Sequence, residues 1–385
     1  MKFKTILRWG LFYISCALFG ALCAFFAKKL PAGTLDPFFS LWDNGLGLDR
    51  WITILLTISI SFILFILAVF LQIILHEAGH LICGLISGYK FVSFRIGTFT
   101  IIKEGKKLKI KKFSIAGTGG QCLMAPPEKE DSERACILYN SGGVIANLLS
   151  AILCIFLLKL QVPYPFGILL FFLTVVGIIA ALLNGIPLKL NEVGNDAYNI
   201  LLVRKDPIAR KSIFLQLHVN ALLSTGMRLK KMPEEWFELP EDGNLDNYLH
   251  AGIKFLEYYY HLDNLNFEKA KECLESLSLH LPQMIGIYQK EIKLEQIFLR
   301  ILEGKSKEEI DNLFDSQLKK YTVQYSNYMI NKIRILYTYS LLIEKDKEKA
   351  EHLYEKAIKK GKTYPVKGEV DSEMELMDYV KTFAN

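Results

Sequence analysis

The chain has 385 residues, of which 51% are hydrophobic and 22% are charged, and its formal net charge is +6 at pH 7. Residues 1–203 contain long uncharged stretches, whereas residues 204–385 are dense in Lys, Glu, Asp and Tyr. This change of composition predicts two domains, one for lipid and one for water. The seven cysteines are odd in number and form no CxxC pair, which argues against a disulfide framework and a cysteine metal site. The sequence also lacks a nucleic-acid signature and a Walker or Rossmann glycine pattern.

Four segments are long and apolar enough to cross the ~30 Å hydrocarbon layer as helices, which takes about 20 residues. They lie near residues 9–27, 55–87, 135–158 and 165–188. The first follows basic residues, as a signal peptide does. Its apolar run is longer than the roughly 7–15 residues of a signal-peptide core, so we expect an uncleaved anchor.

The basic residues between these spans predict how the chain is oriented. The loop at 88–134 carries ten Lys and Arg, the loop at 28–54 carries three, and the turn at 161–165 carries none. Cytoplasmic loops are enriched in Lys and Arg. We therefore expect a multi-pass protein of the cell membrane whose N-terminus, basic loop and C-terminal domain are cytoplasmic. The basic loop is also expected to lie against anionic lipid headgroups.

The second predicted span contains His76-Glu77-Ala78-Gly79-His80. Positions i and i+4 share one face of a helix, so both imidazoles can bind one metal ion, with Glu77 beside it to take a proton from a bound water. Zinc suits two nitrogens plus an oxygen and lowers the pKa of its water to about 7. A charged side chain within a span costs about 2.5–3.5 kcal/mol on insertion scales, so a Glu here calls for a function. We predict one zinc ion held by His76 and His80, with Glu77 as the general base.

Three short segments after this span have the β-branched and aromatic content of strands. They are Tyr89–Ile96, Thr98–Lys103 and Leu108–Ile115, and together they make the loop at 89–115 rich in β-structure. The loop ends at Gly117-Thr118-Gly119-Gly120. An edge of such a sheet could pair with an unwound segment of a substrate by β-addition.

Together these features resemble the site-2 protease family of intramembrane zinc metalloproteases, over residues 55–200. The strands and the Gly-Gly turn are similar to the membrane-associated sheet of that family. Asn140–Asn147 resembles the family's Ala-Gly-Pro-x-x-Asn segment, with Gly143 in place of the Pro. Asn184-Gly185-Ile186-Pro187, followed by Asp196, resembles the family's Asn-x-x-Pro and Asp-Gly, with Ala197 in place of the Gly.

The resemblance implies that Asp196 completes the zinc site of His76 and His80. Two alternatives remain open. Glu192 could be the third ligand, and Asp196 could instead cap the helix that follows it, because Asp is favoured at that position.

The resemblance also implies where a substrate binds. Asn184, Pro187 and Asn147 are the expected substrate contacts, since the family uses the Asn near the Pro to hold an extended segment. Pro187 cannot continue a helix and frees backbone groups, which suits an active site within the membrane, although an ordinary kinked end of a span explains it too. Small residues in Asn140–Asn147 also allow close contact between helices.

From residue 204 the chain reads as amphipathic helices with a repeat of 40 residues. Ala270, Ile310 and Ala350 are spaced 40 residues apart. Just before each of them, acidic and basic residues mark the expected start of a helix. This predicts an array of about three helix pairs, similar to tetratricopeptide repeats but longer than their ~34 residues. Such an array binds a peptide or protein on its concave face, or serves as a structural cap.

The predicted fold class is mostly α. A polytopic membrane domain at 1–203, with about four spans and a small membrane-associated β-sheet, precedes a soluble α-helical repeat domain at 204–385. The implied function is hydrolysis of peptide bonds in membrane-embedded or membrane-proximal substrates, with Glu77 acting on a zinc-bound water. The expected partners are a membrane-protein or membrane-peptide substrate and a ligand of the C-terminal repeats, with no nucleic acid.

Two competing functions fit parts of the sequence. A membrane metalloprotease of the prenyl-protein protease or heat-shock type also carries HExxH on a span, but it uses a downstream Glu as the third ligand and lacks the Asn-x-x-Pro segment. A catalytically inactive relative would act as a scaffold that binds peptides through its C-terminal helices. The intact HEAGH argues against the scaffold, whereas Ala197 leaves it open.

Overall fold

The computed structural model describes residues 50–105, 107–112, 119–127, 133–160, 162, 165–190 and 193–384. The chain divides into two compact units. The first ends at Ile82 and resumes at Ser141–Leu188, and the second comprises Cys83–Asn140 and the chain from Lys189 onward. Compact units of backbone contacts need not coincide with functional domains, so the boundary between residues 203 and 204 stays a prediction. The span near residues 9–27 lies outside the described residues.

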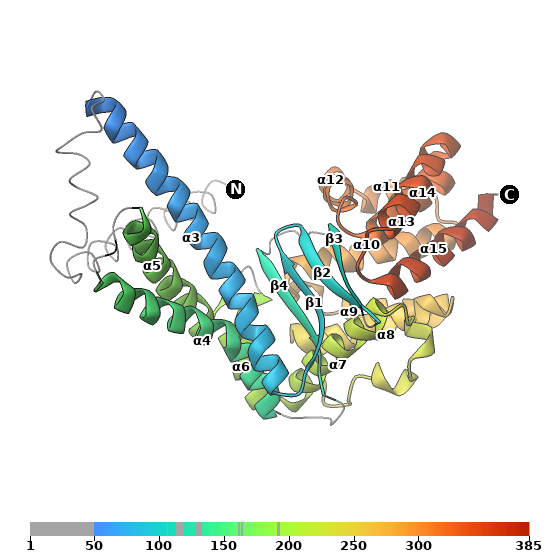
Figure 1. Cartoon of the computed structure of the whole chain (residues 1–385). Helices are drawn as coiled ribbons and strands as arrows, with labels where there is room; N and C mark the ends of the chain where they lie inside the picture. Colours follow the sequence, from blue (N-terminus) through green and yellow to red (C-terminus); the bar gives the residue numbers. More distant parts are fainter. Residues whose placement is uncertain are drawn as a thin grey trace. The chain divides into compact units, whose positions relative to one another are not determined.

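Three long helices have the length and composition needed to cross a membrane (Figure 1). They are α3 (Arg50–Ile86), α4 (Glu133–Leu158) and α5 (Phe166–Gly185). Their bounds lie within a few residues of the predicted spans at 55–87, 135–158 and 165–188, except that α3 begins five residues earlier. Three of the four predicted spans are therefore confirmed as long apolar helices.

Glycines let the backbones of α3 and α4 touch. A Cβ added to Gly79 would lie 2.1 Å from the carbonyl oxygen of Gly142, and one added to Gly142 would lie 2.3 Å from the oxygen of Gly79. Small residues permit such an approach between helices in lipid. The close helix contact that the small residues of Asn140–Asn147 allow is thus found at Gly142.

The second unit contains a four-stranded antiparallel sheet in the order β3-β2-β1-β4 (Figure 1). The strands are β1 (Lys90–Ile96), β2 (Phe99–Glu104), β3 (Lys107–Lys112) and β4 (Gly120–Ala125). The first three confirm the predicted strands, although residues 113–115 of the third lie outside the described residues. β4 was missed, because it begins at a glycine that the sequence marks as a turn. Pairing with β1, for example of Cys122 with Phe94, makes this segment a strand.

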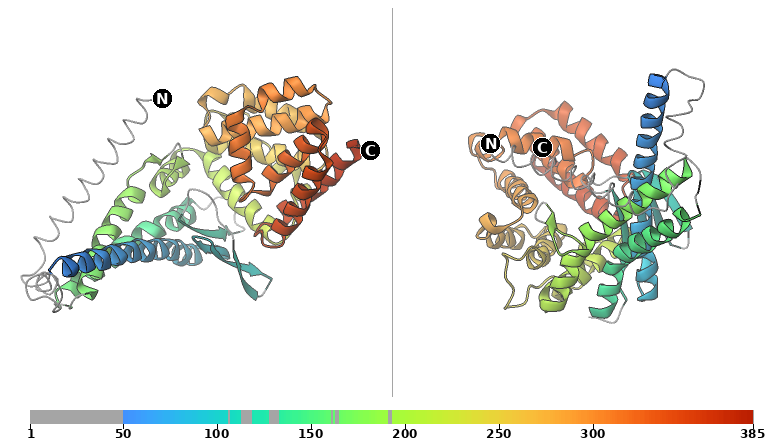
Figure 2. Two further views of the ribbon diagram at one scale, coloured as in Figure 1. Left: turned by 90° about the horizontal axis from the view of Figure 1, so that it is seen from above. Right: turned by 90° about the vertical axis from the view of Figure 1, so that its left-hand side faces the viewer.

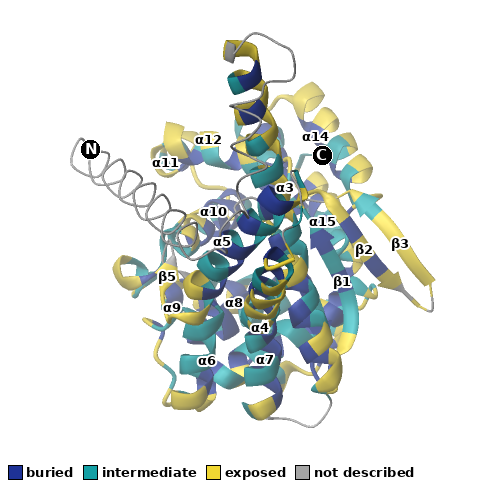
Figure 3. Cartoon of the chain, turned by 60° about the vertical axis from the view of Figure 1, so that its left-hand side comes forward, coloured by how far each residue is buried: buried dark blue, intermediate teal, exposed yellow. Residues whose placement is uncertain are grey.

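The two faces of the β2–β3 hairpin differ in exposure. Arg95 on β1 and its partner Thr100 on β2 are buried on one face. On the other face, Ile101 pairs with Ile110, and Ile110 is 75% exposed. β3 also carries four lysines and is exposed along nearly its whole length (Figure 3). Exposed apolar and basic side chains on one hairpin are compatible with the predicted contact to lipid headgroups, which stays a prediction.

Helices make up most of the remaining chain of the second unit (Figure 2). A short hairpin of β5 (Lys189–Leu190) and β6 (Val193–Gly194) precedes them. The helices are α6 (Asp196–Lys205), α7 (Pro207–Ser224), α8 (Tyr248–Asp263), α9 (Phe267–Ser278), α10 (Gly286–Leu302), α11 (Lys307–Leu313), α12 (Ser316–Tyr325), α13 (Ile330–Thr338), α14 (Lys347–Gly361) and α15 (Lys367–Lys381). Short 3-10 helices lie between or after them, and a π-helix, η4 (Tyr339–Glu344), continues α13.

The 40-residue spacing reappears in the starts of three helices. Each of the helices α9, α11 and α14 begins directly after an N-cap residue. The side chain of that residue accepts a hydrogen bond from a backbone N–H in the first turn, and the three N-caps are Asn266, Ser306 and Asp346. The apolar positions that defined the spacing, Ala270, Ile310 and Ala350, are all at most 2% exposed. The relation of these helices to tetratricopeptide repeats stays a prediction.

Candidate metal centre

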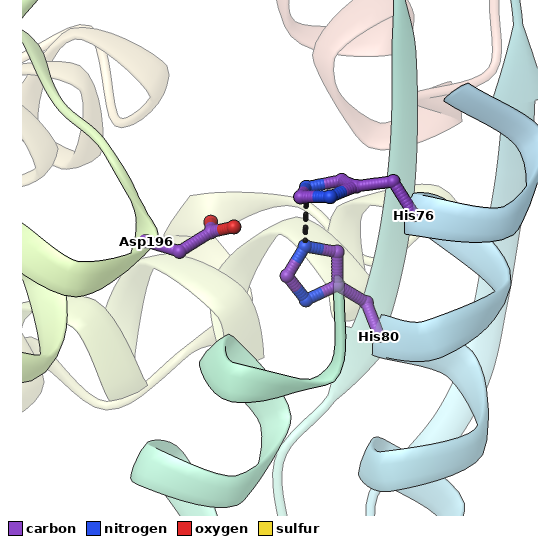
Figure 4. A group of neighbouring side chains, drawn as sticks. All are labelled: His76, His80 and Asp196. Carbon is purple, nitrogen blue, oxygen red and sulfur yellow. Dashed lines mark hydrogen bonds between the residues drawn. The ribbon is translucent and has the colours of Figure 1, made fainter. Parts of the chain in front are cut away.

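The two histidines of HEAGH lie one turn apart on α3 and face each other. Their Nε2 atoms are 3.1 Å apart, and their ring planes cross at 83° (Figure 4). Two Zn–N bonds of normal length at a tetrahedral angle would place the nitrogens about 3.3 Å apart. His76 and His80 therefore fit as two ligands of one metal ion.

Asn147 on α4 fixes the orientation of the His76 ring. The Nδ1–H of His76 donates to Asn147 Oδ1 at 2.8 Å. The Nδ2 of Asn147 donates to the main-chain oxygen of Gln72 at 3.1 Å and to its Oε1 at 2.7 Å. Because Nδ2 faces these two acceptors, Oδ1 faces the ring and the proton of His76 belongs on Nδ1. The lone pair on Nε2 is then left for a metal, as in metal sites where a carbonyl holds the other ring nitrogen.

Gln72 connects this hydrogen-bond chain to α5. Its Nε2 donates to the carbonyl oxygen of Leu173 at 2.8 Å and to Ser150 Oγ at 3.0 Å. Gln72 is 2% exposed and Asn147 is 0% exposed. Within a membrane such polar groups must find partners inside the protein. Residues from three helices thus determine where the His76 ring points.

Two further glycines make room for these side chains. A Cβ on Gly143 would lie 2.3–2.6 Å from atoms of the His76 ring. A Cβ on Gly177 would lie 2.7 Å from Gln72 Nε2. Contacts that short do not occur between real atoms, so a larger residue would displace the ring or the amide. The glycine at position 143, where the family pattern has Pro, is therefore needed for the placement of His76.

Glu77 and His80 are buried, at 9% and 8% exposure. Glu77 lies between the two histidines in the sequence and on the same continuous helix. This position is the one expected for a proton acceptor beside the metal.

Asp196 is the first residue of α6. The helix is capped by Asn195, whose Oδ1 accepts a hydrogen bond from the Tyr198 N–H at 2.9 Å. The interpretation of Asp196 as the helix cap is therefore wrong. His76, His80 and Asp196 each offer one ligand atom, and these atoms lie within 4.8 Å of one another (Figure 4). Glu192, the alternative ligand, lies outside the described residues.

The three residues expected to contact substrate have different surroundings. The amide of Asn147 is engaged with His76 and Gln72. The Nδ2 of Asn184 donates to the carbonyl oxygen of Ala180 at 3.0 Å, and Pro187 is exposed just after α5 ends at Gly185. The end of α5 before Pro187 agrees with the helix-breaking role of proline. Their contacts with a substrate stay a prediction.

Sequence reasoning missed Gln72, Ser150 and Gly177. A signal for Gln72 was present, because it stands one turn before His76 inside an apolar span, where polar residues are costly. Ser150 and Gly177 carry no such signal, since small residues are common in spans.

A second group with metal-ligand atoms within 4.8 Å of one another consists of Glu257, His261 and Cys273. Glu257 already pairs with Lys254 at 2.7 Å. Burial, followed by the charge of Glu257, raises the pKa of the Cys273 thiol to about 12. Both observations disfavour a metal at this second group.

The comparisons with known proteins bear on the first group. The model of peptidase family M50 matches residues 64–345, well over half of the chain, including HEAGH and the segment around Asp196. No curated protein and no solved structure gives a significant match.

Proposed function

The chain belongs to peptidase family M50, the site-2 protease family, and from this premise we propose that it is an intramembrane zinc metalloprotease. It hydrolyses peptide bonds of membrane-embedded or membrane-proximal substrates. The observation that carries the proposal is the 3.1 Å separation of the His76 and His80 Nε2 atoms, with the other nitrogen of His76 held by Asn147. Membership of a membrane metallopeptidase family and three helices able to span a membrane agree with it.

His76, His80 and Asp196 are the residues that would hold the zinc ion (Figure 4). Two imidazole nitrogens and a carboxylate oxygen are a donor set that zinc accepts in hydrolytic sites. When bound there, zinc would polarise the scissile carbonyl and lower the pKa of a water bound to it to about 7.

Glu77 performs the proton transfers of the reaction. Its carboxylate accepts a proton from the attacking water as the new C–O bond forms, and it returns this proton to the leaving nitrogen as the C–N bond breaks. Asn147 and Gln72 keep the His76 ring in one orientation throughout. Asn184 and Pro187 are the proposed contacts for the extended substrate segment.

A substrate helix must unwind before it is cut, because its peptide groups are hydrogen-bonded within the helix. The sheet leaves β3 and β4 as edge strands. Pairing with one of these edges would hold the unwound segment extended. Proline substitutions along the edge strand that pairs with the substrate would then impair cleavage without changing the zinc content.

The orientation of the spans is part of the proposal. Ten Lys and Arg in residues 88–134 support a cytoplasmic sheet and a cytoplasmic C-terminal domain. A reporter fused after residue 384 would be protected from outside reagents in intact cells, and labelling from outside would contradict this orientation.

The function is tested with Glu77→Gln, which keeps the shape of the side chain and removes its basicity. Zinc content should stay at one ion per chain, while membrane peptides that the wild type cleaves should accumulate. Glu308→Gln, at an exposed position of α11, is the matched control and should behave as wild type. Equal peptide profiles in wild type and Glu77→Gln would favour the scaffold function instead.

The third ligand is tested separately. Asp196→Ala should lower the zinc content and Glu192→Ala should not. The reverse result would assign the ligand to Glu192.

A further inference from the structure

The interior of the C-terminal helices holds buried charges in unequal number. The side chain of Arg334 is fully buried and donates to both oxygens of Glu295, at 2.9 and 2.7 Å, and to Glu373 at 2.6 Å. Lys332, also fully buried, donates to Glu291. Glu369 lies near these groups as a fourth carboxylate, so two cations face four acids.

Of the four carboxylates, Glu369 on α15 has the least positive charge beside it. Tyr364 Oη donates to its Oε1 at 3.1 Å, and it forms no ion pair with any described residue. Burial, followed by the charge of Glu373, raises the pKa of Glu369 to about 7, although Lys332 lowers it in part. The cluster therefore lacks positive charge at Glu369.

A cavity of about 200 Å³ opens beside this residue. α15 contributes Glu369 and Glu373 to its wall, and the start of α13 contributes Asn331. Leucines of α7, α8 and the turn between them make the apolar part of the wall, together with Met329. The wall includes no Lys or Arg among the described residues.

Asn331 gives an independent sign of a ligand. It is 5% exposed, and its buried Oδ1 has no hydrogen-bond partner among the described residues. A buried carbonyl oxygen without a donor is costly, and native proteins rarely leave one so. The wall of the cavity thus includes two glutamates and an asparagine whose carbonyl oxygen has no donor among the described residues.

We propose that this cavity binds the side chain of a lysine residue in a peptide, with the ammonium group at Glu369, Glu373 and Asn331 Oδ1. The methylene stem of the lysine lies against the leucines and Met329, since long basic side chains bury their stems on apolar surface. An ammonium group is compact and carries three donors, one for each acceptor residue, whereas a guanidinium group is a larger, rigid planar fork with five donors.

The size of the cavity and its neighbour support a peptide as the ligand. Clefts for whole small molecules measure about 300–1,000 Å³, so a smaller cavity suits one side chain. A second cavity of about 310 Å³ shares Met329 and Glu369 with the first and extends to Ser93 and Thr100 of the sheet. It has room for the residues beside the lysine. Arg95 lines this second cavity, which disfavours a cation there.

Peptide binding to the full-length protein in lipid nanodiscs tests the proposal. The probe is the tripeptide acetyl-Gly-Lys-Gly-amide, and titration calorimetry measures its Kd. Peptides with norleucine or arginine in place of lysine are the comparisons. Norleucine keeps the stem and removes the ammonium group. The test does not require catalysis, so its outcome is independent of the proposed protease function.

The lysine peptide should bind at least tenfold more tightly than the norleucine and arginine peptides. Glu369→Gln should weaken its binding at least tenfold, and Asn331→Leu should weaken it about fivefold. Asp371→Asn, which removes an exposed carboxylate from the same helix, is the matched control and should not change Kd.

Four results would overturn the proposal. They are no binding of the lysine peptide at millimolar concentration, equal binding of the norleucine peptide, tighter binding of the arginine peptide, or unchanged binding by a Glu369→Gln protein whose thermal unfolding shows that it is folded.

Discussion

The His76 site and the Glu369 cavity solve the burial of polar groups in different ways. Around His76, the supporting side chains are neutral: the amides of Gln72 and Asn147 and the hydroxyl of Ser150, each hydrogen-bonded to the next helix. Around Glu369, full charges are buried in pairs, and the acids outnumber the bases.

The surroundings of each region explain this difference. In a membrane span, a charge without a functional role is expensive, so positioning is left to neutral hydrogen bonds. Among the helices of the second unit, a buried ion pair is tolerable when both partners are well hydrogen-bonded, and we propose that the surplus charge is kept for a ligand. The comparison teaches that neutral hydrogen bonds fix the His76 ring, whereas the cluster at Glu369 keeps more acids than bases.

The largest effect is expected from removing a ligand of the metal. His80→Ala leaves His76 as the only imidazole of the pair, so zinc content should fall close to zero and cleavage to background. Zinc per chain is measured by atomic spectrometry on purified protein. His352→Ala, at an exposed position of α14, should keep full zinc content. Retention of one zinc ion in His80→Ala would contradict the site.

A smaller effect is expected from removing one of the neutral side chains that hold the His76 ring by hydrogen bonds. Asn147→Leu keeps the size of the side chain and removes its hydrogen bonds to His76 and Gln72, and loss of such a partner typically weakens metal affinity about 10–100-fold. Competition with a chelator measures this affinity. Asn184→Leu is the control, because the Asn184 amide bonds only within its own helix among the described residues. Equal zinc affinities in the two variants would show that Asn147 does not position His76.

Gly143→Ala tests the steric part of the same support. The added Cβ would overlap the His76 ring, so the ring must turn away from Asn147. We expect zinc affinity to fall about tenfold, near the low end of the range for disturbed ligand support. Unchanged zinc affinity would mean that the helices shift apart without cost.

The smallest effect is expected at Glu369, and it concerns stability. Its pKa is about 7 when folded against about 4.5 when unfolded, so the folded state holds an extra proton between these values. Stability therefore falls as pH rises from about 4.5 to 7. Glu369→Gln should stabilise the fold by about 1 kcal/mol at pH 8 after allowance for solvent screening, and not at pH 4. Thermal unfolding at both pH values measures this difference, and a destabilised variant at pH 8 would contradict the surplus charge.

The sequence by itself determined those features of the fold and the site that depend only on residues close together in the chain. The i, i+4 spacing placed His76 and His80 on one face of a helix, and apolar length alone located α3, α4 and α5. Residue type and alternation gave the first three strands. In each case the physical cause, such as helix periodicity or strand pleating, is local and can be read from the chain.

Tertiary structure alone decided what depends on residues far apart in the chain. The bond between His76 and Asn147 joins residues 71 positions apart, and the need for Gly143 follows only from the ring packed against it. β4 is a strand because β1 lies beside it, and the cavity at Glu369 exists because helices from four parts of the chain meet there. Such contacts follow from packing between elements, and no local pattern records which elements will pack together.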